Sequence, residues 1–218
     1  MLTFLCLGLF FGVSSASTLF VSHGGANDGT IPKAGEIGMI DTVTKVYTTL
    51  TTLTGYSFTS LAYDGSKLVL YRTAAGGGGN LPGSYVFVDP ISGLSAGPDV
   101  PAVTGGGGVG SPLTDLVYDP ATSKFFGTDS GIQYVEVNPA TGAKTIILSA
   151  MATSASRNTA TYPCSAFVSI ALVNGEIYAT CQANAQQGYS TSVTTELMVL
   201  DKNTGRFRNQ KNLFRCIS

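Results

Sequence analysis

One short turn motif recurs four times along this sequence, each time directly after a segment of alternating apolar residues. The copies are GMIDTVTK, VFVDPISG, VEVNPATG and MVLDKNTG, with turn-opening residues Asp41, Asp89, Asn138 and Asp201. These residues lie 48, 49 and 63 positions apart, a period typical of repeats that each form one four-stranded sheet. The repeat therefore predicts a chain built from equivalent antiparallel sheets.

The residue types of the motif explain the turn. An Asp or Asn side chain at the opening position can accept a hydrogen bond from the backbone two residues later. Gly93, Gly142 and Gly205 close three of the turns and can adopt positive φ, whereas the first copy has Lys45 at this position.

Further strand-like segments flank each turn. Hairpin signals such as Asn174-Gly175 join the first two strands of a unit, and another strand follows the Asp/Asn turn. Each unit is therefore predicted to be a meander of strands A, B, C and D, without helical periodicity. The predicted units span approximately 17–57, 58–112, 113–166 and 167–218.

Residues 133–142 (QYVEVNPATG) and 196–205 (ELMVLDKNTG) resemble the repeat of secreted β-propellers of the YVTN or quinoprotein-like type. This resemblance implies an all-β propeller of about four four-stranded blades. The first unit begins at strand B, and we expect the C-terminal segment 212–218 to supply its missing strand and close the ring. The alternative is an incomplete propeller or a fragment of a larger one. Tryptophan is absent, so the resemblance implies no quinone cofactor.

The first sixteen residues predict a signal peptide. An apolar run from Leu2 to Val13 precedes small residues typical of a signal-peptidase site, and we expect cleavage after Ala16. No later stretch is long and apolar enough to predict a membrane span. The predicted product is therefore secreted and extracellular.

Three cysteines remain after this cleavage, Cys164, Cys181 and Cys216, and they allow at most one internal disulfide. A two-residue turn at Asn174-Gly175 would place Cys181 opposite Val168, too far along the strand from Cys164 for a bridge. We therefore expect Cys216 to pair with one of the other two, or all three to stay reduced.

The charge of the chain argues against nucleic acid as a partner. Charged residues make up only 11% of the sequence, with 12 basic and 13 acidic side chains and no run of either sign. Such a chain lacks the basic patch that binds phosphate backbones.

Long connections gather on one predicted face. The B–C loops 24–35, 73–83 and 182–195 and the D–A loops 101–111 and 152–164 leave the same end of the strands, and several are rich in glycine. We call this end the long-loop face. Because insertions in repeat folds gather at binding surfaces, we expect it to bind a protein, peptide or glycan.

Aligning the B strands gives a candidate site. His23, Arg72, Asp129 and Cys181 occupy equivalent final positions, one per blade. We expect these four residues, with neighbouring Gln182, to line a ligand pocket at the mouth of a central channel.

Catalytic motifs are scarce. The chain has one histidine and no G-x-S-x-G sequence, which argues against a histidine-rich metal site and an α/β-hydrolase nucleophile. Calcium is the one cofactor left open, through carboxylates that could also act as acid–base pairs: Asp28, Glu36, Asp99, Asp115, Asp129 and Glu196. The predicted function is a non-catalytic binding or scaffold protein. The alternatives are an extracellular calcium-dependent, lactonase-like hydrolase and a truncated product without independent function.

Overall fold

The computed structural model describes most of the repeat region as β-strands. The described residues are 18–22, 35–53, 57–73, 83–103, 113–129, 133–149, 164–183, 195–205, 207–208 and 215–216. The predicted signal peptide lies outside them. Within these ranges no helix occurs, and so none that could cross a membrane.

The described residues form sixteen strands, in chain order: β1 (Thr18–Ser22), β2 (Glu36–Asp41), β3 (Tyr47–Thr52), β4 (Ser57–Tyr63), β5 (Leu68–Thr73), β6 (Ser84–Val88), β7 (Val100–Pro101), β8 (Leu113–Asp119), β9 (Lys124–Asp129), β10 (Gln133–Asn138), β11 (Ala143–Ser149), β12 (Cys164–Val173), β13 (Glu176–Ala183), β14 (Thr195–Leu200), β15 (Phe207–Arg208) and β16 (Arg215–Cys216). They form four antiparallel sheets in sequence order. We call these blade 1 (β1–β3), blade 2 (β4–β7), blade 3 (β8–β11) and blade 4 (β12–β16).

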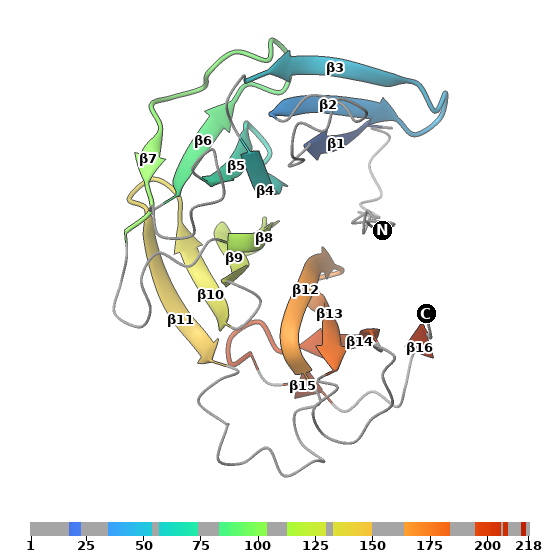
Figure 1. The fold of residues 1–218 in the computed structure, drawn as a ribbon, viewed down its shortest axis with the longest axis vertical. Helices are drawn as coiled ribbons and strands as arrows, with labels where there is room; N and C mark the ends of the chain where they lie inside the picture. Colours follow the sequence, from blue (N-terminus) through green and yellow to red (C-terminus); the bar gives the residue numbers. More distant parts are fainter. Residues whose placement is uncertain are drawn as a thin grey trace.

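The blades are arranged in an open arc with blades 1 and 4 at its two ends (Figure 1). Strands β1, β4, β8 and β12 lie innermost, and β1 contacts β4, β4 contacts β8, and β8 contacts β12. The outer strands include β3 and β11 (Figure 1). The described strands therefore form an all-β propeller of four blades, as the repeat predicts, in an incomplete ring.

The Asp/Asn turns have the predicted hydrogen bonds. Asp41 Oδ1 accepts from the backbone N–H groups of Val43 and Thr44, each at 2.8 Å. These two bonds lower the pKa of Asp41, because they favour its charged form. Asp89 and Asp201 accept the same two hydrogen bonds at their own turns. Asn138 Oδ1 accepts the first of them, from Ala140 N–H at 3.1 Å.

Apolar clusters fill the junctions between consecutive blades. Because side chains alternate along a strand, β5 directs Leu68 and Leu70 toward blade 1 and Val69 and Tyr71 toward blade 3. All four are at most 1% exposed. A third cluster joins blades 3 and 4 around Tyr134, Phe126, Ile170, Ile177 and Leu200.

The predicted ring closure by the C-terminal segment is wrong. Strand β16 pairs with β14 of its own blade, with Arg215 opposite Glu196, and not with blade 1. The two-residue strand β15 covers only Val199 and Leu200 of β14. The remaining residues on that side of β14 are therefore available to pair with β16.

The register of blade 4 corrects one detail of the cysteine prediction. A bulge between Phe167 and Ser169 places Cys181 opposite Phe167 instead of Val168. Cys164 lies opposite Ala183, so the prediction that Cys164 and Cys181 are not opposed holds. Cys216 pairs with Thr195.

Candidate functional site

Three of the five predicted site residues occupy equivalent positions in the sheets. Arg72 pairs with Phe58, Asp129 with Leu113 and Cys181 with Phe167, and each partner lies just before a bulge in its inner strand. The sequence alignment of these three positions is therefore correct. His23 and the side chains of Cys181 and Gln182 lie outside the described residues, and the pocket itself stays a prediction.

Arg72 lies near the end of β5, where the loop to β6 begins. Its guanidinium is 3.5 Å from Asp99 Oδ2 and 3.4 Å from the Ser84 hydroxyl. The side chains of Arg72 and Asp99 are 30% and 37% exposed. This ion pair therefore holds a cationic group at the long-loop face while leaving part of it in contact with solvent.

Asp129 has a different environment from Arg72. Its side chain is 6% exposed, and its Oδ2 lies 2.5 Å from Lys144 Nζ. The Tyr85 hydroxyl and Asp129 Oδ1 are buried and have no hydrogen-bond partner among the described residues. Burial raises the pKa of Tyr85, with a smaller contribution from the Tyr71 and Asp129 charges. Asp129 thus belongs to a buried polar cluster between blades 2 and 3 and not to a solvent-facing rim.

Asp115 is a polar anchor between inner strands. Its Oδ2 accepts hydrogen bonds from the Ser169 hydroxyl at 2.6 Å and the Ile170 N–H at 2.8 Å, and its Oδ1 accepts from Leu116 N–H. Burial raises the pKa of Asp115, although these three donors act in the opposite direction. The carboxylate therefore ties β8 of blade 3 to β12 of blade 4.

Asp115 was predicted only as a candidate carboxylate, and the bulges beside it and its equivalents were not predicted. The inner strands have register shifts between Phe58 and Ser60, Leu113 and Asp115, and Phe167 and Ser169. The signal was present in the segments FTSL, LTDL and FVSI, where two apolar residues are three positions apart instead of two.

The described carboxylates do not converge. Asp99 pairs with Arg72, Asp129 with Lys144, and Glu36 accepts hydrogen bonds from Tyr47 and Thr49. In the part of the chain that the structure describes, no three His, Cys, Asp or Glu residues are grouped so as to hold a metal ion. Asp28 and the Glu196 side chain lie outside that part, so calcium stays an untested prediction.

Comparison with known proteins gives structural similarity alone. No protein-family model and no curated protein matches the sequence. The chain is similar to the β-propeller domain of Myceliophteria thermophila Cps50 (Swd1) at 13% identity and a TM-score of 0.48, covering 93% of this chain and 53% of that one. It is similar to TolB from Acinetobacter baumannii at 15% identity and a TM-score of 0.47, covering 79% and 37%. A protein of unknown function from Bacteroides caccae matches at 13% identity and a TM-score of 0.44, covering 91% and 74%. The chain thus spans about half or less of the first two structures.

Proposed function

We propose that this chain is a secreted, non-catalytic binding or scaffold propeller that recognises a protein, peptide or glycan through its long-loop face. The observation that supports this proposal is the partly exposed Arg72–Asp99 pair at that face. In a chain with 11% charged residues, a fixed and accessible guanidinium is a specific recognition group. Arginine is enriched among residues that dominate binding energy.

The remaining predicted site residues have separate roles in this proposal. Asp129 supports the site from within, since its carboxylate is buried against Lys144. His23, Cys181 and Gln182 are the proposed rim residues of the neighbouring blades. Arg72 is the described residue that would contact the ligand directly.

A binding experiment tests the proposal with a matched control. The purified chain is applied to arrays of immobilised peptides and glycans, and the strongest binder is titrated against Arg72→Ala and Lys124→Ala. Lys124 forms an ion pair with Glu136 of similar exposure, 49% and 37%, at the start of β9 and thus at the opposite end of the strands. We expect Arg72→Ala to weaken binding about tenfold or more and Lys124→Ala to leave it unchanged. Equal effects of the two substitutions would contradict the proposal.

Secretion has its own test. Expressed with its N-terminal segment in a secreting host, the protein is expected in the medium with Ser17 as its first residue, as N-terminal sequencing would show. Retention of the full-length chain inside the cells would contradict this part of the proposal.

A further inference from the structure

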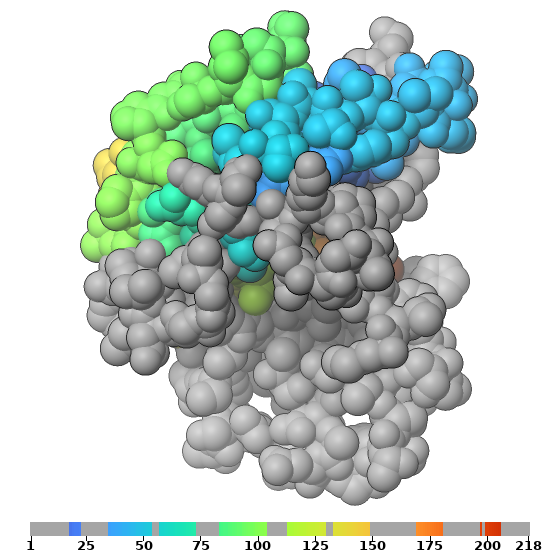
Figure 2. Space-filling model, turned by 45° about the horizontal axis from the view of Figure 1, so that its top comes forward, coloured from blue at the N-terminus to red at the C-terminus, as the bar shows by residue number. Residues whose placement is uncertain are grey.

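Each junction inside the arc brings the closing glycine of a C–D turn against the outer strand of the preceding blade. Figure 2 shows the green residues of blade 2 lying against the blue and cyan residues of blade 1. A Cβ atom added at Gly93 would lie 2.6 Å from the Leu50 carbonyl oxygen of β3. Such a separation is far inside van der Waals contact.

The same arrangement occurs at the other two junctions. An added Cβ at Gly142 of blade 3 would collide with the Pro101 carbonyl oxygen of β7, and one at Gly205 of blade 4 would lie 2.6 Å from Leu148 Cβ of β11. Gly142 also accepts a hydrogen bond from Val103 N–H of blade 2 at 2.9 Å. A blade that packs behind a neighbour in this way therefore requires glycine at the closing position.

Blade 1 has Lys45 at this position. Its turn has the same geometry, since Lys45 has φ of 62° against 65° for Gly205. Lys45 N–H donates to the Asp41 carbonyl at 2.8 Å, as Gly93 N–H donates to the Asp89 carbonyl at 3.0 Å. The Cβ of Lys45 therefore occupies the space that a preceding outer strand fills at the other three turns.

A second position at which blade 1 differs from the other blades lies on the face that points away from blade 2. Ile37 points into the junction with blade 2, so its neighbour Gly38 lies on the outward face. Val86 and Val135, three residues before their turns as Gly38 is, are buried in junctions with the preceding blade. A side chain at Gly38 would collide with the Tyr47 ring. Blade 1 therefore covers this position with its own aromatic residue.

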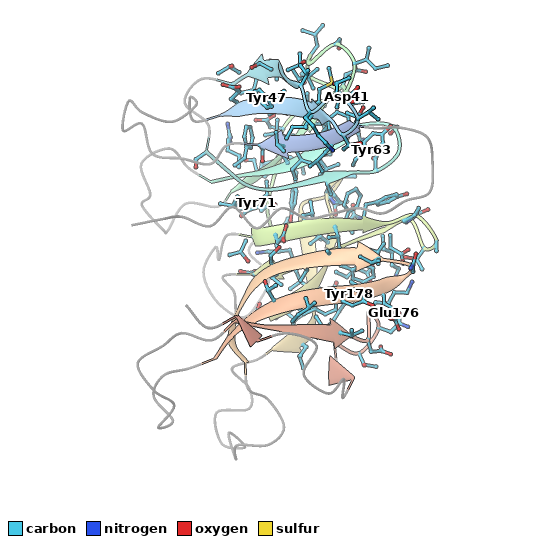
Figure 3. All side chains as sticks on the ribbon, turned by 90° about the vertical axis from the view of Figure 1, so that its right-hand side faces the viewer. Asp41, Tyr47, Tyr63, Tyr71, Glu176 and Tyr178 are labelled. Carbon is cyan, nitrogen blue, oxygen red and sulfur yellow. The ribbon has the colours of Figure 1, made fainter. Side chains whose placement is uncertain are left out.

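Tyr47 is held in place over Gly38. Its hydroxyl donates to Glu36 Oε1 at 2.6 Å, and the Thr49 hydroxyl donates to the same oxygen at 2.7 Å. Burial, together with the hydrogen bond to Glu36, raises the pKa of Tyr47 to about 12. Figure 3 shows Tyr47 and Asp41 on the first sheet, at the opposite end of the arc from Tyr178 and Glu176 of blade 4.

We infer that blade 1 is a capping blade. Its outward face is completed by Lys45 and by Tyr47 over Gly38, and it does not accept another blade in the manner of the three internal junctions. Blade 1 therefore packs in this manner neither against blade 4 of the same chain nor against blade 4 of a second copy. Repeat arrays need such end units, because an unmodified end would expose the apolar face that internal repeats bury.

The test converts the cap to the residues of an internal blade. The variant Gly38→Val, Lys45→Gly, Tyr47→Ser places the residues of blade 2 (Val86, Gly93 and Ser95) at the equivalent positions of blade 1. We expect this variant to reach at least twice the light-scattering mass of the unsubstituted chain at the same concentration. Val43→Ser, at a 76% exposed turn position of the same blade, is the control and should leave the mass unchanged.

Two outcomes would overturn the inference. One is an unchanged mass for the triple variant once circular dichroism shows that it is folded; if it does not fold, the double variant Lys45→Gly, Tyr47→Ser is measured and judged in the same way. The other is protection of Tyr47 from hydroxyl-radical labelling that increases with the concentration of the unsubstituted chain. Such protection would show that the face is an interface and not a cap.

Discussion

The junction between blades 3 and 4 contains charged side chains, whereas the described contacts between blades 1 and 2 are apolar. Lys202 Nζ of blade 4 lies 2.6 Å from Asp119 Oδ2 of blade 3, and Asp115 joins the inner strands of the same two blades. Between blades 1 and 2, Ile37 packs with Leu68, and Phe20 lies 5.6 Å from Tyr63 between ring centroids.

This difference shows that one repeat can build two kinds of junction. Apolar packing is common to both, and its strength does not depend on pH. The charged contacts at blades 3 and 4 add dependence on ionisation and on intact partners. The free energy of unfolding should therefore depend on pH and on removal of charges mainly through the contacts between blades 3 and 4.

The largest expected effect comes from emptying the apolar junction. Ile37 is fully buried, and Ile37→Ala should lower the free energy of unfolding by about 3–4 kcal/mol through lost burial and the cavity left behind. Urea unfolding at pH 3.5 and pH 7 should give the same loss. The control Ile91→Ala, at an 89% exposed position, should change it by less than about 0.5 kcal/mol. A loss that varies with pH would show that this junction contains a titrating group after all.

Next in size is the glycine contact at the same junction. Gly93→Ala introduces a Cβ against the Leu50 carbonyl and a non-glycine residue at φ of 71°. The combined cost should be about 2–3 kcal/mol in urea unfolding. Gly65→Ala separates the two causes, because Gly65 has φ of 94° and a Cβ added there would have no contact within 4 Å. This variant should cost only about 1 kcal/mol. Equal losses would mean that blade 1 shifts to accommodate the Cβ atom.

Removing the cation of the charged junction should have a somewhat smaller effect. Lys202→Met leaves Asp119, whose side chain is 1% exposed, without its ion-pair partner, and should lower the free energy of unfolding by about 2 kcal/mol. Lys124→Met breaks the exposed pair with Glu136 and should cost under about 1 kcal/mol. If both variants lose the same amount, the Lys202 contact is no more than a surface ion pair.

The smallest effects should appear in the pH dependence of two asparagine variants. For Asp119, desolvation acts to raise the pKa, but the hydrogen bonds from Lys202 and Thr122 outweigh it and lower the value. Its contribution is therefore present above pH 3.8 and lost as the pH falls through the folded-state pKa. Asp119→Asn should become more costly as the pH rises from 3 to 6.

Asp115 should show the opposite sign. Burial raises the pKa of Asp115 in the folded state. As the pH rises from the ordinary pKa of an aspartate toward this raised pKa, ionisation of Asp115 therefore disfavours the folded state. Asp115→Asn should therefore become less costly over the same pH range in urea unfolding. Parallel curves for Asp115→Asn and Asp119→Asn would contradict the assigned shifts.

The sequence was sufficient to predict the blades, because their turns depend on local chemistry. An Asp or Asn bonds to the backbone two or three residues later, and a glycine with positive φ closes the turn, so no distant partner is needed. The pairing of β16 could not be predicted in this way. It depends on how much of the β14 edge the short strand β15 leaves open, and this is a property of the assembled sheet.

The sequence predicted the strand positions of the candidate site residues but not the burial and contacts of their side chains. Equivalent strand positions were identified correctly for Arg72 and Asp129, yet the side chain of Arg72 is partly exposed and that of Asp129 is buried. The cause is Lys144, fifteen positions after Asp129, which contacts it only after the blade has formed. Asp115 likewise depends on donors more than fifty positions away.

The bulges of the inner strands decide which face of the sheet each apolar residue occupies. In β8 the bulge allows Leu113 and Leu116, three residues apart, both to face blade 2. Straightening the strand without changing its length would turn Leu113 toward blade 4. Deleting Thr114 would instead place the two leucines two positions apart, where simple alternation keeps both on one face. The apolar junction with blade 2 should therefore survive loss of the extra residue more readily than loss of the bulge at constant length.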